Sequence, residues 1–184
     1  MNRIAPIDPA QATGKNQQLF AAVQSKLGVV PNMMRVLGNA PAALDAYLGF
    51  GNALSHGAFD GRVREQIALT VAESNLCGYC LSAHTFLGAK FGLQPDEIEH
   101  ARNAGSKDPR TDAVLKLARS VVLKRGELSD ADLKAARTAG LGDAEIVETV
   151  ANVALNLLTN YVNHIARTAV DFPEVKPGQV GASV

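Results

Sequence analysis

The apolar residues of this chain recur every three or four positions in almost every segment, and no segment alternates apolar and polar residues as a half-buried strand would. The last such segment, from Glu145 to about Thr168, is apolar on most sides of the expected helix. A helix of that kind has to be buried at the centre of the fold or to lie in a subunit interface. The spacing therefore predicts an all-α fold, built as a compact multi-helix domain.

Glycines, prolines and capping residues indicate where the helices begin and end. Glycine is favoured just past a helix end, and four glycines follow apolar-periodic segments: Gly28, Gly57, Gly92 and Gly140. The expected helices are 17–27, 33–37, one that opens at Asn39 and Pro41, one capped by Asp60, 77–91, one that opens near Pro95, 113–123, one from Ser129 to Ala139, and 145–168. Residues 1–15 are expected to form a loose N-terminal arm, and residues 172–184 an irregular tail.

Composition limits the classes of partner. No charge-rich or Pro/Gly/Ser-rich linker divides the 184 residues, so we expect one domain over 1–184. The 18 basic and 18 acidic residues leave no surplus of positive charge to neutralise phosphates, which argues against a nucleic-acid partner. The first residues lack a continuous apolar signal segment, and no stretch offers eighteen uninterrupted apolar residues. We therefore expect no membrane partner and a cytoplasmic location.

The chemistry-bearing residues cluster around the only two cysteines. Glu65, Cys77, Cys80 and His84 form the pattern E-x11-C-G-Y-C-x3-H. In a helix that starts at about Cys77, positions 77, 80 and 84 share one face. Two cysteines are too few for a disulfide framework, and C-x-x-C spacing in a reducing compartment indicates catalysis or metal binding.

These residue types suit thiol chemistry. A helix N-terminus stabilises a thiolate, and Cys77 to Cys80 lie at such an opening. His84 can remove the thiol proton, and a carboxylate on its other ring nitrogen fixes the tautomer and raises the basicity of the ring. Glu65 would reach the site from the preceding helix, where Ala68, Leu69 and Ala72 share its face.

Each residue also has an interpretation that involves no catalytic role. Glu65 can pair with Arg62 one turn away, and His84 can be a core histidine with satisfied hydrogen bonds. Neighbouring cysteines are often small buried hydrophobes. Their occurrence together in one pattern favours the thiol site.

The same residues carry a family resemblance. The pattern of Glu65, Cys77, Cys80 and His84 resembles the carboxymuconolactone decarboxylase-like superfamily, in its alkylhydroperoxidase D-like branch. Val30-Pro31-Asn32 and the segment from Asn160 to Pro173 look like the two ends of its peroxidase-related subgroup. The resemblance implies an all-helical fold that forms homo-oligomers, often trimers or hexamers, and a thiol-dependent peroxidase or disulfide reductase activity.

Carried over by position, the resemblance makes Cys80 the peroxidatic thiolate, Cys77 its proton donor and resolving partner, and Glu65 with His84 the proton relay. An external dithiol, of a lipoyl type among others, would reduce the resulting disulfide, and the cycle would need no metal, haem or flavin. Tyr79 stands where the best-known members have histidine. It can orient substrate by a hydrogen bond but does not titrate near neutral pH.

The last expected helix carries an uncharged polar stripe formed by Asn152, Asn156, Asn160 and Asn163. We favour core or subunit-contact hydrogen bonding for this stripe, because buried amides are usually satisfied by protein groups. The alternative is that Asn156 and Asn160 line the substrate site together with Tyr79.

Three functions stay open at this point. The favoured one is a cysteine-based peroxidase that acts on a small hydroperoxide. The second is a metal-binding module that uses Cys77, Cys80, His84 and Glu65, ligand types that zinc accepts. The third is a helical oligomer that senses oxidation or serves as a scaffold without turnover. Lactone decarboxylation is disfavoured by the resemblance, since members with that activity generally lack the cysteine pair.

Overall fold

The computed structural model describes residues 2–178, and within that part every regular element is helical. The predicted all-α class is therefore confirmed. After a short 3-10 turn at Pro9–Gln11, the elements are α1 (Gly14–Leu27), α2 (Asn32–Leu37), α3 (Pro41–Leu54), α4 (Gly61–Ser74), α5 (Gly78–Lys90), α6 (Pro95–Arg102), α7 (Pro109–Leu123), α8 (Asp130–Thr138) and α9 (Asp143–Ala166).

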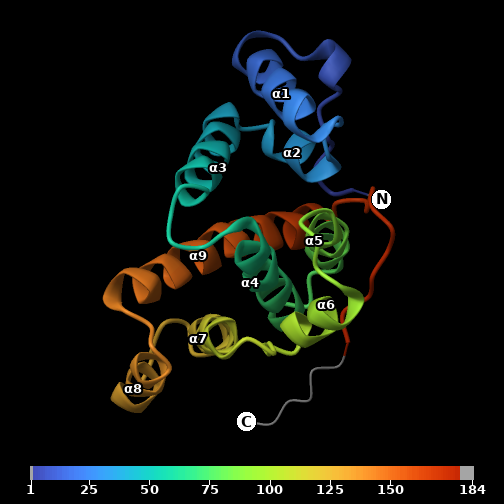
Figure 1. Cartoon of the computed structure of the whole chain (residues 1–184). Helices are drawn as coiled ribbons and strands as arrows, with labels where there is room; N and C mark the ends of the chain where they lie inside the picture. The colour runs from blue at the N-terminus through green and yellow to red at the C-terminus, as the bar shows by residue number, and fades with distance from the viewer. Residues whose placement is uncertain (1, 179–184) are drawn as a thin grey trace.

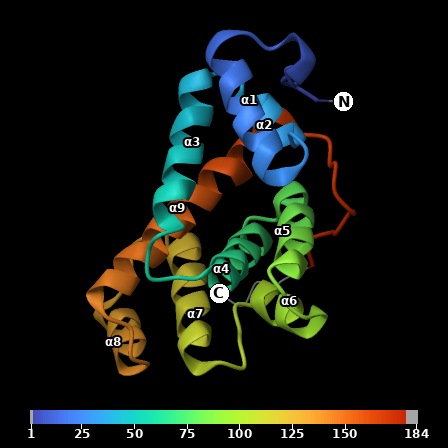
Figure 2. The same ribbon diagram turned by 45° about the horizontal axis from the view of Figure 1, so that its top comes forward.

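Helix α4 is the packing centre of the fold. It packs against α5, α6, α7 and α9, and α9 also contacts α2, α3, α5 and α7. The largest fully buried apolar side chains come from several of these helices: Leu44, Ile67, Leu69, Leu81 and Leu115. Figures 1 and 2 show α9 crossing the molecule, with α1–α3 gathered to one side of it and α4–α7 to the other. Of the two positions expected for the last helix, the centre of the fold or a subunit interface, these contacts show the central one.

Capping chemistry explains most helix starts. The Asp60 side chain accepts a hydrogen bond from the amide of Val63, and Ser129 with Asp132 forms a reciprocal capping box, as the sequence predicts. Helix α7 begins at Pro109, four residues before the expected Ala113, because Asp108 caps it and proline is favoured in the first helical turn.

The N-terminal arm differs from the expectation. Helix α1 begins at Gly14, so the arm is shorter than 1–15. The arm is irregular but is held by backbone hydrogen bonds, with the amide of Arg3 donating to Ala166 and that of Ile7 to Arg35. Polar residues at the start of α1 gave no apolar spacing to reveal this first turn.

The C-terminal tail is irregular over the part that the structure describes, which ends at residue 178, so residues 179–184 of the expected tail lie outside the described residues. It nevertheless runs along the body of the protein. The amide of Val175 donates to Ser82 in α5, and the amide of Gly178 donates to the buried carboxylate of Glu73 in α4. Arg102 pairs with the same carboxylate at 2.7 Å. No helix in residues 2–178 is long and apolar enough to cross a membrane.

Candidate active site

The turn between α4 and α5 positions Cys77. The amide of Cys77 donates to Ala72 and that of Leu76 to Glu73, which is the hydrogen-bond pattern of a Schellman helix end. Leu76 takes the left-handed conformation that this motif requires, with φ at 54°, although glycine is the usual residue there. A non-glycine residue in that conformation costs on the order of 1 kcal/mol. The turn places Cys77 immediately before α5, in the N-cap position.

Cys80 occupies the first turn of α5 and is 3% exposed. The side-chain amide of Asn163 in α9 donates a hydrogen bond to its sulfur at 3.2 Å, and the Thr159 hydroxyl lies 3.9 Å from it. A hydrogen bond from Cys77 lowers the pKa of Cys80 to about 6; burial opposes this shift, and the nearby His84 charge, Asn163 and Thr159 support it. Cys80 is therefore the cysteine that ionises first.

The pKa of Cys77 is shifted in the opposite direction. The hydrogen bond that it shares with Cys80 and its burial both raise the pKa of the Cys77 thiol, so that Cys77 keeps its proton while Cys80 is a thiolate. Its sulfur lies 4.0 Å from the backbone carbonyl oxygen of Asn160. Both cysteines are free thiols in this structure.

His84 and Glu65 meet across the α4–α5 interface. The distance between His84 Nδ1 and Glu65 Oε2 is 2.8 Å, and both side chains are largely buried. Burial alone lowers the pKa of His84, but the charge of Glu65, its hydrogen bond and the charge of Cys80 raise it above its ordinary value. Because the Glu65 carboxylate is bonded to Nδ1 of His84, the Nε2 atom of the ring is available to other partners. Arg62 pairs with Glu97 instead of Glu65, so the surface-pair interpretation of Glu65 is wrong.

The metal-binding alternative needs a group of ligands that the described residues do not bring together. Among residues 2–178, no group of three or more His, Cys, Asp or Glu side chains converges closely enough to hold a metal ion. The thiols are instead hydrogen-bonded to each other and to α9, while the carboxylate of Glu65 is engaged by His84.

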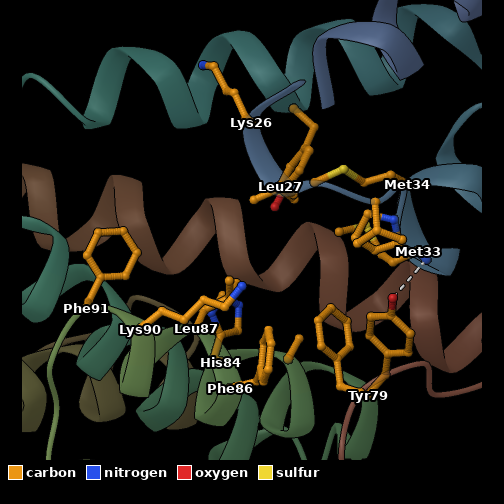
Figure 3. Close-up of a pocket in the computed structure, with 15 residues that line it drawn as sticks. Lys26, Leu27, Met33, Met34, Tyr79, His84, Phe86, Leu87, Lys90 and Phe91 are labelled. Atoms are coloured by element: carbon orange, nitrogen blue, oxygen red, sulfur yellow. Dashed lines mark hydrogen bonds between the residues drawn. The ribbon is translucent and has the colours of Figure 1, made fainter. Parts of the chain in front are cut away.

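A cavity of about 290 Å³ opens beside His84 between α5 on one side and the α1–α2 region on the other (Figure 3). Its walls are mainly apolar, and Tyr47, Tyr79 and His84 are among the residues that line it. The remaining lining residues are Lys26, Leu27, Val29, Pro31, Met33, Met34, Ala83, Phe86, Leu87, Lys90, Phe91 and Phe172. The cavity reaches His84 but is not lined by either cysteine.

Tyr79 forms part of the cavity wall with its hydroxyl already engaged. The hydroxyl donates to Asp171 at 2.8 Å and accepts from the amide of Met33 at 3.1 Å, the bond drawn in Figure 3. The ring packs edge-on against Phe172. Burial, together with the hydrogen bond and charge of Asp171 and the charge of Cys80, raises the pKa of Tyr79 despite the Met33 amide, so the phenol stays neutral. Tyr79 therefore ties α5 to α2 and to the tail.

The asparagine stripe of α9 is buried along its length. The Asn156 side chain donates to the backbone carbonyl of Asn152, and Asn160 accepts from the side chain of Asn75 at the end of α4. Neither Asn156 nor Asn160 lines the cavity, in contrast to the substrate-lining alternative. These contacts agree with hydrogen bonding inside the protein.

Sequence reasoning assigned no site role to Asn163, Tyr47 or Phe172. Asn163 had a signal, since it belongs to the polar stripe one turn from Thr159 and Asn160. Tyr47 lines the cavity, and burial together with the charges of Cys80 and Glu65 raises its pKa, which keeps its hydroxyl protonated. Phe172 lies in an irregular segment, and no sequence pattern connects it with α5.

Comparison with known proteins agrees with this geometry. A family model described as the carboxymuconolactone decarboxylase family matches residues 41–106, the segment that contains Glu65, Cys77, Cys80 and His84. No curated protein matches the chain.

Several solved structures share the fold. One is the alkylhydroperoxidase AhpD core of an uncharacterized peroxidase-related protein from Ralstonia eutropha JMP134, at 24% identity and a TM-score of 0.82 over 92% of each chain. Another, an uncharacterized peroxidase-related protein from Silicibacter sp. TM1040, has 24% identity and a TM-score of 0.77 over 91% of this chain and 92% of that one. The debrominase Bmp8 has 16% identity and a TM-score of 0.78 over 92% of each chain.

The family match covers the segment that forms the thiol site, and the structural likeness extends over nearly the whole chain. The segment that forms the thiol site therefore matches the carboxymuconolactone decarboxylase family, and the chain as a whole shares the fold of alkylhydroperoxidase D-like proteins.

Proposed function

We propose that this protein is a thiol-dependent peroxidase, or disulfide reductase, that reduces small hydroperoxides through Cys80 and Cys77. The observation that carries the proposal is the arrangement at the start of α5, where Cys77 and Cys80 lie three residues apart, the Asn163 amide is 3.2 Å from the Cys80 sulfur, and His84 pairs with Glu65 at 2.8 Å. The lowered pKa of Cys80 and the raised pKa of Cys77 agree with this arrangement. A peroxidase of this type needs one thiolate to attack the peroxide and one protonated thiol to follow it.

The first step is attack by the Cys80 thiolate on a peroxide oxygen. A sulfur–oxygen bond forms, the oxygen–oxygen bond breaks, and the alkoxide leaves as an alcohol after it takes a proton. His84 supplies that proton, because Glu65 at 2.8 Å favours its charged form. The substrate approaches from the cavity past His84, which lines the cavity and interacts with the charge of Cys80.

The second step closes a disulfide. The Cys77 sulfur attacks the sulfenic sulfur of Cys80 as the Cys77 thiol gives up its proton, a sulfur–sulfur bond forms, and the hydroxyl group leaves as water. An external dithiol then supplies two electrons and two protons to restore both thiols. The side-chain amide of Asn163 at 3.2 Å stabilises the thiolate at the start of each cycle.

The direct test measures hydroperoxide consumption by the reduced protein with a panel of dithiols that includes dihydrolipoamide. We expect multiple turnovers and a Cys77–Cys80 disulfide when the dithiol is exhausted. A protein that forms the disulfide but cycles with no dithiol would instead be an oxidation sensor or a scaffold. Release of bromide from 2,3,4-tribromopyrrole without peroxide would favour the chemistry of the structurally similar debrominase.

The pH dependence follows from the two ionisations. A lowered pKa means that the Cys80 thiolate is present above about pH 6 and is lost below it, so alkylation by iodoacetamide should rise through an inflection near pH 6. Peroxide kcat/KM should rise over the same range and fall at higher pH, where His84 loses its proton. Mass spectrometry of the labelled protein should place the modification on Cys80.

Asn163→Leu provides the matched control for this titration. Removal of the amide donor at 3.2 Å should move the inflection to higher pH, because that hydrogen bond favours the thiolate. An inflection of the wild-type protein near the ordinary thiol value of about 8.5 would contradict the assignment of Cys80.

We also propose that a second copy of the chain covers the outer face of α9. Five large apolar side chains lie exposed along that helix at spacings of three, eight, three and four residues: Val147, Val150, Leu158, Tyr161 and Ile165. Their exposed fractions reach 67% at Val147 and 62% at Ile165. A continuous apolar stripe of this length is typical of a surface that associates, and one stripe can pair with itself across a two-fold axis.

Charge placed on the stripe should separate the subunits. We expect Tyr161→Asp with Ile165→Asp to convert a wild-type oligomer into a monomer, because each buried carboxylate would lack a partner. Size-exclusion chromatography with light scattering measures the mass. Leu123→Asp at the end of α7, where the leucine is 59% exposed outside the stripe, is the matched control. A wild-type protein that stays monomeric at high concentration would contradict the proposal.

A further inference from the structure

The cavity beside His84 has a distinct charge pattern. Its walls are mostly apolar, with Met33, Met34 and Phe172 among them, and Tyr47, Tyr79 and His84 line it as well. Two lysines and no aspartate or glutamate line it. An apolar cavity with cationic side chains and no acid is complementary to a ligand that is itself apolar and carries a negative charge.

Lys90 is the better placed of the two lysines. It is the last residue of α5, and its ammonium lies 4.6 Å from the centre of the Phe86 ring, over another lining residue. Figure 3 shows the Lys90 side chain reaching along the α5 wall toward His84 and Phe86, while Lys26 lies on the opposite side with its nitrogen directed away from Lys90.

Neither lysine forms a salt bridge within the described part of the chain. Four other lysines there do pair with acids within 4.0 Å: Lys15, Lys107, Lys116 and Lys124. A position near a helix C-terminus stabilises an ammonium group, and both Lys26 and Lys90 lie in the last turns of their helices. That effect accounts for lysine at these positions but not for the lack of acids around the cavity.

We propose that the cavity selects hydroperoxides that carry a carboxylate on a compact apolar body. This inference rests on the proposed peroxidase function and names its substrate class. The carboxylate pairs with one of the two lysines, Lys90 or Lys26, and the oxygen–oxygen bond points to His84. A volume of about 290 Å³ lies at the small end of ligand cavities, so the body is a single aromatic ring or a short hydrocarbon chain.

Aromatic side chains on the α5 side of the cavity suit a ring in particular. Phe86 and Phe172 lie with ring centroids 5.8 Å apart, and Phe91 lines the outer part of the same α5 wall. Phe86 is 37% exposed and Phe91 49% exposed, so both rings offer apolar surface to a ligand in the cavity. A bound ring would remove this apolar surface from water.

The test compares three hydroperoxides that differ at one position. Cumene hydroperoxide is neutral, its para-carboxylate derivative carries the charge, and the methyl ester of that derivative restores neutrality at similar size. We expect wild-type kcat/KM for the carboxylate to exceed that for the ester on the order of fivefold at low ionic strength, the upper range for an exposed ion pair. The preference should shrink as salt is added.

The lysine variants show whether the cavity is responsible. In the double variant Lys26→Gln with Lys90→Gln, kcat/KM for the carboxylate should fall to about that for the ester or below it, because the cationic partners are gone. Lys134→Gln removes one exposed lysine of α8 away from the cavity and should keep the wild-type ratio. Circular dichroism confirms that both variants are folded.

Binding of a ligand without a peroxide separates this inference from the proposed function. Calorimetry with 4-isopropylbenzoate and its methyl ester should show the same preference for the anion, lost in the double lysine variant. Equal binding and equal rates for acid and ester in the wild-type protein would overturn the carboxylate proposal, and hydroperoxide turnover would still support the peroxidase. Absence of turnover with preserved anion binding would overturn the peroxidase proposal while the anion selectivity of the cavity stands.

Discussion

Replacement of Cys80 by serine is expected to lower peroxide kcat/KM by at least about 10³-fold, the order of loss seen when an enzyme loses its nucleophile. A serine hydroxyl does not ionise near neutral pH, so the hydrogen bonds that stabilise the Cys80 thiolate have no anion to stabilise. The measurement is steady-state hydroperoxide consumption with dihydrolipoamide as the reductant.

Cys77→Ser is the control that separates the two thiols. This variant should consume about one equivalent of hydroperoxide and then stop, because Cys80 still attacks but no second thiol resolves the sulfenic acid. Dimedone should label Cys80 in that variant and not in the wild-type protein supplied with dithiol. Undiminished turnover in Cys80→Ser would remove the basis of the proposed mechanism.

The second large effect concerns His84. We expect His84→Gln to lower kcat/KM by about 10²-fold, the lower range for loss of a general acid. The same change should raise the pKa of Cys80, because the charge of His84 is one of the contributions that lower it. Alkylation rates against pH measure the shift, and steady-state rates measure the loss.

Two further substitutions define the role of the relay. Glu65→Gln keeps a hydrogen-bonding group beside His84 Nδ1 but removes the negative charge. It should therefore lower kcat/KM, by less than His84→Gln does. Arg62→Gln alters a neighbouring residue of α4 whose side chain pairs with Glu97, and it should leave peroxide turnover near the wild-type rate. A His84→Gln variant with a normal rate and a normal Cys80 titration would exclude His84 from the mechanism.

Local sequence signals predicted most of the fold. Apolar spacing and caps such as Asp60 and Ser129 act within one or two turns of the chain, so the sequence alone shows where the helices lie. The adjacency of Glu65 and His84 was also within reach, because a largely buried acid on α4 needs a partner and α5 follows it directly.

The cavity could not be predicted in the same way. Its walls come from α1, α2, α3, α5 and the tail, and their meeting depends on packing between segments far apart in the sequence. The conformation of Leu76 could not be predicted either. The Schellman turn holds this residue in the left-handed conformation, which leucine on its own disfavours. Tyr79 looked available to substrate, but Asp171, more than ninety positions away in the chain, accepts its hydroxyl proton in a hydrogen bond.

The position of Phe172 in the sequence affects the order in which the protein is made. Phe172 and Asp171 follow every helix that the structure describes, yet they contact Tyr79 next to the cysteine pair. During synthesis the ribosome releases α4 and α5 well before this segment. The nascent polypeptide therefore carries both thiols for some time without the segment that later packs on Tyr79, the residue before Cys80, and this is the stage at which we expect Cys77 and Cys80 to be most open to premature oxidation.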